Sequence, residues 1–223
     1  MRTVPATARG LTALALALTL GLTLLTGGAR TARADEPQAQ LSAEDRAALV
    51  EALERTWADV RKEVDGLSAE QLAFKPAPDR WSVAQVVEHL VRAEALLRDK
   101  VVASALASTP RTQEEMTKYP PVHDAAIWLA TTNRSRKFPA PTELQPTGEW
   151  SQEEGGDHTF AAARTKTLEF VRTTQADLRS HYAPHPLFGA IDACQWLIAI
   201  AAHTDRHLEQ IREVKASPGF PAA

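Results

Sequence analysis

The sequence predicts an all-α fold, a four-helix bundle with a long crossover between its second and third helices. Four segments repeat apolar residues at intervals of three and four, which is the spacing of one helix face. A proline-rich stretch of about 50 residues separates the second segment from the third. No alternating strand pattern, internal repeat or glycine-rich phosphate loop is visible.

The first helix is predicted over residues 42–64. Ser42 is placed to cap it, Glu44 and Asp45 stand in its first turn, and Gly66 follows its end. Its apolar face consists of Leu49, Leu53, Trp57 and Val60.

The second helix is predicted over residues 82–106 and has the clearest start signal in the chain. Ser82 and Gln85 match a capping box, and Trp81 against Val86 matches a hydrophobic staple. The residues expected to face inward are Val83, Val86, Val87, Leu90, Leu97 and Val101. We therefore expect Trp81 and Ser82 to contribute to stability rather than to chemistry.

The crossover, residues 108–157, carries six prolines and the Gly155-Gly156 pair, with one short helix expected near 123–131. A connection this long is not a hairpin loop. It is long enough to carry the chain back along the bundle, which predicts that the second and third helices run parallel.

The third helix is predicted over residues 158–180, with Asp157 as its cap. Pro184-His185-Pro186 then breaks the chain, and the fourth helix is predicted over residues 190–215.

Residues 1–34 have the layout of a secretory signal peptide. Arg2 and Arg9 form a positive segment, an apolar run follows, and Ala32-Arg33-Ala34 offers a cleavage site. The alternative is an uncleaved membrane anchor, although the apolar run is short for a span. We expect cleavage, a mature domain of residues 35–223, and a periplasmic or secreted location without further membrane contact.

The charge and cysteine content of the mature chain exclude several classes of partner and site. The signal segment holds four of the 25 basic residues and none of the 28 acidic ones, so 21 basic and 28 acidic residues remain, a net charge of −7. An acidic chain without a basic cluster argues against nucleic acid as a partner. Cys194 is the only cysteine, which excludes an internal disulfide and a cysteine-rich zinc site. The oligomeric state stays open, with a homodimer among the alternatives.

The clearest functional signal is the pair His203 and His207 in the fourth helix. They share a helix face with Trp196, Ile200, Ile211 and Val214. Four residues of helix rise about 6 Å, so both rings can reach one metal ion. Burying two imidazoles without partners is costly, and a shared metal satisfies both. The alternative is a buried pair satisfied by protein hydrogen bonds alone.

A metal needs a third ligand, and His89 in the second helix is the best candidate. Glu94, in line with the apolar residues of the same helix, is a candidate general base or a partner that orients a ligand. The alternative for Glu94 is a carboxylate that reaches the bundle end. Histidine ligands favour Zn²⁺ or Ni²⁺ as the divalent ion.

The other titratable residues receive structural interpretations. We expect His185 to cap a loop, Cys194 to lie in the core, and Arg206 to face the site mouth, where it can stabilise an anionic substrate. Asp205 and Glu209 are expected in solvent or paired with Arg206 and Arg212. Surface positions are expected for His123, His158 and His181.

Several of these motifs together resemble the DinB-like superfamily. They are the run RWSVAQVVEHL at 80–90, RSRKFPAP at 134–141, HPLFG at 185–189 and HTDRHLEQI at 203–211. The resemblance covers most of the mature chain and implies a four-helix bundle with a long crossover. It also implies a metal held by three histidines, which map to His89, His203 and His207.

Two classes of function follow for a small-molecule substrate or ligand. Three neutral imidazoles that hold a divalent ion leave a position for water, which favours metal-dependent hydrolysis. The resemblance also implies transfer of thiols such as bacillithiol or mycothiol, a reaction of cytoplasmic relatives that fits poorly with export. The alternative class is a non-catalytic metal- or ligand-binding stress protein.

Overall fold

The computed structural model describes residues 41–148 and 156–222, with the side chains of 156–159 left out. The predicted signal peptide and its cleavage site lie outside these residues. Among the described residues, no helix combines the length and the apolar character that crossing a bilayer requires.

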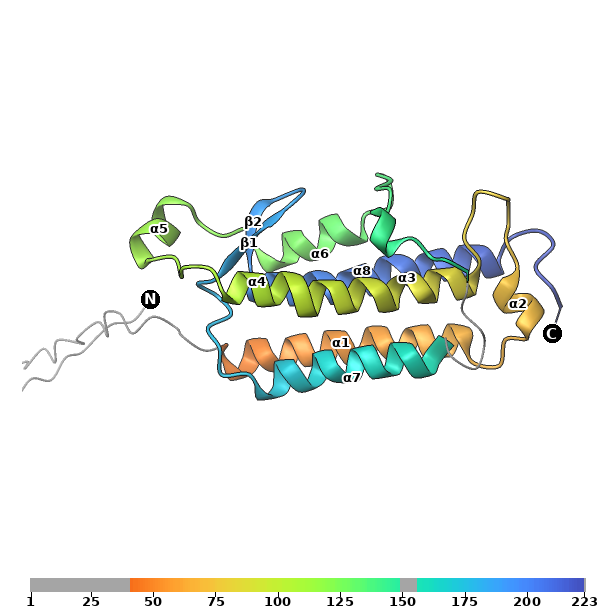
Figure 1. Ribbon diagram of the computed structural model, residues 1–223, viewed down its shortest axis with the longest axis horizontal. Helices are drawn as coiled ribbons and strands as arrows, with labels where there is room; N and C mark the ends of the chain where they lie inside the picture. The colour runs from red at the N-terminus through yellow and green to blue at the C-terminus, as the bar shows by residue number, and fades with distance from the viewer. Residues whose placement is uncertain (1–40, 149–155, 223) are drawn as a thin grey trace, which may run out of the picture. The chain divides into compact units, whose positions relative to one another are not determined.

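Four long helices build the bundle: α1 (Ala43–Val64), α3 (Val83–Leu96), α7 (Gly156–Thr173) and α8 (Ala193–Lys215). Both α1 and α3 pack against α7 and α8. Figure 1 shows α1 and α8 running in one direction and α3 and α7 in the other. The all-α bundle and the parallel course of the second and third long helices are therefore confirmed.

The capping signals of α1 and α3 act as the sequence predicts, whereas the predicted cap Asp157 lies inside α7, which begins at Gly156. Ser42 accepts a hydrogen bond from the Asp45 backbone N–H at 3.0 Å, and Ser82 and Gln85 form a complete capping box at the start of α3. Helix α3 continues through a π-helical turn, η1 (Leu97–Val102), into α4 (Ala103–Leu106), so the predicted end near residue 106 is confirmed.

Four short helical elements lie in the described segments that connect the long helices. They are α2 (Ala69–Ala73), α5 (Gln113–Lys118), α6 (Asp124–Thr132) and the 3₁₀ turn η2 (Thr142–Leu144). Helix α6 is the short helix expected in the crossover, and it packs along α8. The crossover therefore runs beside the helix that carries two of the candidate ligands.

Between α7 and α8 the structure adds a short β-hairpin, which the sequence analysis did not predict. Helix α7 ends at Thr173 rather than at 180, and β1 (Tyr182–His185) pairs antiparallel with β2 (Gly189–Asp192). The strands are too short to show an alternation of apolar and polar residues, and Pro184 argues against a strand at the position of the first. Because of the hairpin, α8 begins at Ala193 rather than at 190, and Asp192 and Gln195 form its capping box.

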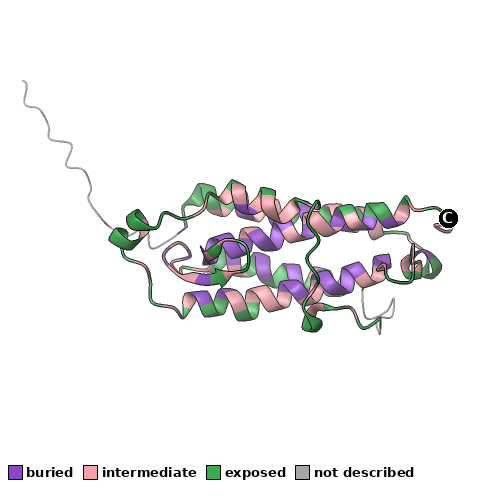
Figure 2. Ribbon diagram, turned by 90° about the horizontal axis from the view of Figure 1, so that it is seen from above, coloured by how far each residue is buried: buried purple, intermediate pink, exposed green. Residues whose placement is uncertain are grey.

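The interior divides into two apolar clusters separated along every long helix by a polar residue. Figure 2 shows the buried residues gathered on the inward faces of the helices. One cluster includes Leu49, Leu53, Val102, Ile127, Leu168, Leu178, Ile191 and Leu197. The other includes Val60, Val83, Val86, Val87, Leu90, Phe160, Leu208, Ile211 and Val214. The polar residues between them are Thr56, Glu94, Arg164 and Thr204, all at most 2% exposed.

Candidate metal centre

The structure brings the three predicted histidines together between α3 and α8. The Nε2 atom of His203 lies 3.2 Å from Nε2 of His89 and 3.1 Å from Nε2 of His207. One nitrogen from each ring lies within 4.8 Å of the others. His89 is 3% exposed, and His203 and His207 are intermediate in exposure.

A backbone carbonyl sets the tautomer of His89. Its Nδ1 lies 2.8 Å from the Leu144 carbonyl oxygen, at the end of η2 in the crossover. Because a carbonyl only accepts hydrogen bonds, Nδ1 carries the proton and Nε2 presents a lone pair. The crossover therefore prepares this ring as a ligand.

Gln210 does the same for His207 from one turn further along α8. The His207 Nδ1 lies 2.8 Å from Gln210 Oε1, so the N–H donates to the amide oxygen and Nε2 again presents a lone pair. Two lone pairs thus point at Nε2 of His203, which carries at most one proton in the neutral ring. One proton cannot complete both short contacts, whereas a cation among the three nitrogens satisfies them all.

Burial keeps all three rings neutral. Desolvation lowers the pKa of His207 to about 3, and the neighbouring His89 and Arg206 add to the effect. Desolvation also lowers the pKa of His89, although its bond to the Leu144 carbonyl opposes the shift. The pKa of His203 lies well below its ordinary value because the ring is desolvated and faces the other two. Neutral imidazole is the form that binds a metal.

The cluster fits a divalent metal in both spacing and chemistry. Two imidazole nitrogens at 2.1 Å from one tetrahedral ion are about 3.4 Å apart, close to the observed 3.1 and 3.2 Å. All three donors are imidazoles, a set that suits zinc, nickel and other late transition metals.

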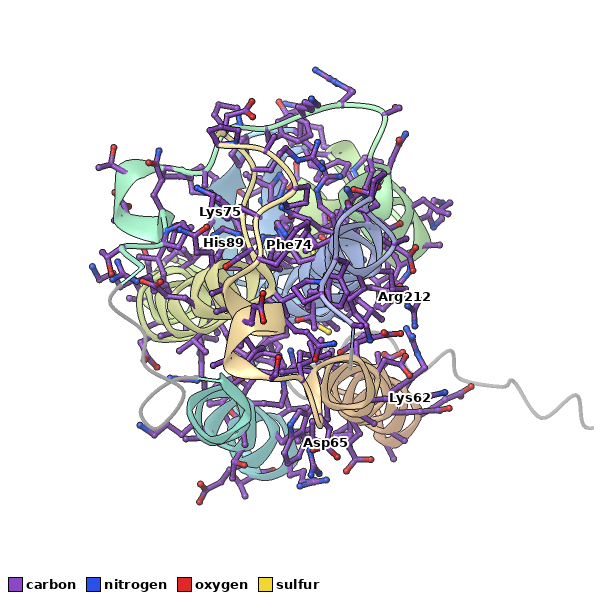
Figure 3. All side chains as sticks on the ribbon, turned by 90° about the vertical axis from the view of Figure 1, so that its right-hand side faces the viewer. Lys62, Asp65, Phe74, Lys75, His89 and Arg212 are labelled. Carbon is purple, nitrogen blue, oxygen red and sulfur yellow. The ribbon has the colours of Figure 1, made fainter. Side chains whose placement is uncertain are left out.

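Trp81 belongs to this site, which sequence reasoning missed. Its ring centroid lies 4.9 Å from that of His89 and 6.3 Å from that of His207, nearly parallel to the latter at 23°. The indole thus forms an aromatic wall of the histidine cluster while also packing against the apolar cluster that includes Val83 and Leu90. Figure 3, which looks along the bundle, shows His89 in the half occupied by α3 and α8. The sequence did contain a signal for this role: Trp81 stands just before the capped helix that carries the candidate ligand His89.

Glu94 has a different neighbourhood from the one expected of a general base. Its two oxygens accept from Nε and Nη2 of Arg164 at 2.8 and 2.9 Å, and it is 2% exposed. A carboxylate held by two charge-assisted bonds in the bundle interior is a poor proton acceptor for a substrate. These contacts favour a structural role for Glu94, in which it neutralises a buried arginine, over the role of a general base.

Arg164 is the centre of a hydrogen-bond network that joins all four long helices. Besides Glu94 on α3, it donates to the Leu53 carbonyl and the Thr56 hydroxyl on α1 and to the Thr204 hydroxyl on α8. These bonds use all five donors of the guanidinium. The network therefore fixes the register of α3 against α8, and with it the positions of the three histidines.

Three of the remaining interpretations agree with the contacts. His185 Nδ1 accepts the Leu187 N–H within the hairpin turn, and its ring lies 4.8 Å from Trp196. His123 is exposed as the residue before α6. Cys194 is 1% exposed and burial raises the pKa of its thiol to about 12, so it behaves as a core residue.

The charged residues near the site are more fully paired than expected. Arg206 donates to the carbonyls of Thr131, Asn133 and Arg136, so it secures the end of α6 and the loop after it instead of facing a substrate. Asp205 lies 3.6 Å from Arg55 rather than pairing with Arg206, whereas Glu209 pairs with Arg212 as expected.

The surface interpretation of His181 was wrong. This ring is partly buried, and its Nδ1 bonds the Ser108 carbonyl at 2.8 Å. The side chain of His158 lies outside the described part of the chain.

Comparison with known proteins agrees with the fold. YuaE of Bacillus subtilis (strain 168), an uncharacterized protein, is 26% identical over 169 residues, which are 74% of this chain and 93% of YuaE. The solved structure of YfiT from Bacillus subtilis has a TM-score of 0.50 and 18% identity, and covers 84% of this chain and 95% of that one. YfiT is described as a probable metal-dependent hydrolase with an unusual four-helix bundle topology. A family model matches residues 52–211, more than half of the chain, and shows that the protein belongs to the DinB superfamily.

Proposed function

We propose that the protein is a metal-dependent hydrolase whose divalent ion is held by His89, His203 and His207. One observation carries the proposal: three Nε2 atoms converge, and in two of the rings the Nδ1–H is already engaged elsewhere. Such an arrangement leaves the nitrogens without a complete set of protein partners. When bound, the ion supplies Lewis acidity and lowers the pKa of water toward neutrality, which hydrolysis requires.

The chain's own residues bind and orient in this proposal. Leu144 and Gln210 hold two of the imidazoles in the required tautomer and limit their rotation. The indole of Trp81 excludes water from one side of the cluster and offers an aromatic face to a substrate. The hydrogen bonds of the three rings involve no carboxylate among the described residues, so proton transfer to an acidic side chain is not part of the proposal.

Two further lines of support are independent of this geometry. The chain belongs to the DinB superfamily, and YfiT, which shares the fold, carries the description of a probable metal-dependent hydrolase. The apolar run and the Ala32-Arg33-Ala34 site favour an exported protein that acts on a small molecule outside the cytoplasm.

Metal analysis followed by an activity panel tests the proposal. The mature protein, residues 35–223, is purified without an affinity tag that binds metal, and its zinc and nickel content is measured. It is then assayed on chromogenic carboxylic esters, phosphate esters and amides, before and after treatment with a chelator. We expect one ion per chain and a hydrolytic activity that the chelator removes and that Zn²⁺ or Ni²⁺ restores.

The His207→Ala variant is the matched comparison, because it removes one of the three donors. A variant that retains full metal occupancy contradicts the ligand assignment. Stoichiometric metal with bacillithiol or mycothiol transfer and no hydrolysis contradicts the reaction and favours the transferase alternative. Metal without either activity favours the binding protein.

A further inference from the structure

Glu88, the residue before His89, is a fully buried carboxylate that binds the crossover. It is 0% exposed, and its Oε1 accepts from the backbone N–H and the hydroxyl of Thr147 at 2.8 and 2.9 Å. Its Oε2 accepts from the Gly148 N–H at 3.2 Å. Glu88 therefore holds two consecutive residues of the crossover against α3.

The charge of Glu88 is balanced locally. Arg92, one turn later on α3, places Nη2 3.2 Å from Glu88 Oε1 and 3.4 Å from the Thr147 hydroxyl. An ion pair and three hydrogen bonds offset the cost of burying the carboxylate, which an isolated group would not recover. This arrangement makes the contact a strong one for a segment that is otherwise largely exposed.

The backbone at Gly148 suits this contact. Its φ of +75° lies in the left-handed region, which residues with a side chain rarely adopt. A Cβ added there would meet only Gln85 Nε2 at 3.7 Å, an ordinary contact. The glycine is therefore required by its backbone conformation, which turns its N–H toward Glu88, and not by lack of space.

Successive residues of α3 thus hold the crossover at two points. Glu88 binds Thr147 and Gly148, while His89 Nδ1–H donates to Leu144 only three residues earlier. We propose that Glu88 is a positioning residue of the metal centre: it fixes the segment 144–148 so that the Leu144 carbonyl holds His89 in its Nδ1–H tautomer. This inference rests on the proposed function in that it assigns a role toward the metal.

The contact matters because the Leu144 carbonyl belongs to the crossover rather than to a long helix. Without the bonds to Glu88, the carbonyl can move away, and the proton of His89 can shift to Nε2, where it blocks the ligand lone pair. Removing a partner that orients a metal-bound histidine costs about 10- to 100-fold in metal affinity.

The Glu88→Gln variant tests the proposal in two measurements. The amide keeps the shape of the side chain but places an NH₂ group or an uncharged oxygen opposite the three donors. The first measurement is the ¹⁵N NMR spectrum of the His89 imidazole in metal-free protein, which reports which nitrogen carries the proton. The second is Ni²⁺ affinity by calorimetry. We expect a mixture of tautomers and an affinity about ten-fold weaker.

Two further variants keep the test decisive. Gly148→Ala disturbs the same contact from the crossover side and leaves the buried carboxylate in place, so it serves if Glu88→Gln does not fold. Glu213→Gln removes a carboxylate on α8 that pairs with Arg80 and Arg134 and is 51% exposed. We expect the first to shift the His89 spectrum in the same direction and the second to leave it unchanged.

The proposal is overturned if Glu88→Gln and Gly148→Ala both retain the Nδ1–H spectrum and Ni²⁺ affinity within two-fold of the parent. It is also overturned if Glu213→Gln changes the spectrum as much as they do. Failure of the parent to bind any metal contradicts the proposed function instead, and the NMR measurement on metal-free protein still decides the role of Glu88.

Discussion

Two of the polar clusters in the described part of this bundle differ in how completely the protein satisfies them. In the Arg164 cluster, five donors meet five oxygen contacts from Glu94, Thr56, Thr204 and the Leu53 carbonyl. In the histidine cluster, the outward nitrogens of two rings are satisfied and the inward nitrogens face one another. The first cluster is complete without a ligand, and the second is not.

The difference separates structure from function among buried polar groups. A saturated network stabilises one arrangement of the helices and has no capacity left for chemistry. In the histidine cluster, nitrogen lone pairs converge and there are too few protons to form hydrogen bonds between them all. This is the arrangement expected of a set of metal ligands. The same reasoning favours a structural role for Glu94, and the ring contacts place Trp81 beside the histidines.

The largest expected effect comes from breaking the Arg164 cluster. Arg164→Ala leaves Glu94 buried without its partner, so we expect a loss of about 3–5 kcal/mol in the free energy of unfolding. Urea unfolding of the metal-free protein measures it. Arg172→Ala is the control, because its pair with Glu54 is half exposed and worth at most about 1 kcal/mol. Equal losses in the two variants would contradict the structural role of the buried cluster.

Metal binding is expected to stabilise the protein only through the histidine cluster. A ligand at 100 times its Kd stabilises the folded state by about 2.7 kcal/mol. We expect that gain for the parent with Zn²⁺ or Ni²⁺, and none for His89→Ala, His203→Ala or His207→Ala. Thermal unfolding with and without metal measures it. A full metal-dependent gain in His203→Ala would remove that ring from the ligand set.

The histidine cluster also predicts acid sensitivity of the metal-free protein. Burial lowers the pKa of His207 to about 3 in the folded state, whereas the unfolded ring titrates near 6.5. Below pH 6.5 the unfolded chain binds the extra proton, so this stability is present above that pH and is lost as the pH falls toward 3. The slope is about 1.4 kcal/mol per pH unit for each such histidine.

Urea unfolding across pH 4–8 measures this slope. His207→Ala is expected to reduce it by the contribution of about one proton. An unchanged slope in His207→Ala would show that this ring does not titrate as its burial requires.

The smallest expected effect is at the start of α3. Ser82→Ala removes the cap of the Gln85 N–H and should cost about 1 kcal/mol. Metal stoichiometry should stay unchanged, since the hydrogen bonds of Ser82 are made with Gln85 and not with a histidine. Trp81→Phe is the informative companion, because it retains an aromatic wall while removing the indole. Loss of metal binding in Ser82→Ala would contradict the assignment of Ser82 to stability alone.

The sequence by itself determined the elements whose signals are local. Capping residues at Ser42 and Ser82 and apolar periodicity predict the long helices, and a crossover of sufficient length predicts that the second and third run parallel. The His203 and His207 pair is also local, because four residues of helix place both rings on one face. The local sequence did not predict the hairpin at 182–192, because strands of four residues are too short to give a periodic signal.

Only the tertiary structure decided which polar residues share a neighbourhood. Glu94 lies on the inward face of its helix in the structure, as the sequence predicts. Its partner Arg164 is 70 residues away, however, and no sequence spacing predicts their contact. Likewise, the Leu144 carbonyl reaches His89 across 55 residues, and Glu88 holds the same segment nearby. Periodicity specifies which face of a helix is buried, whereas the partner across that face depends on how the helices pack and where the crossover lies.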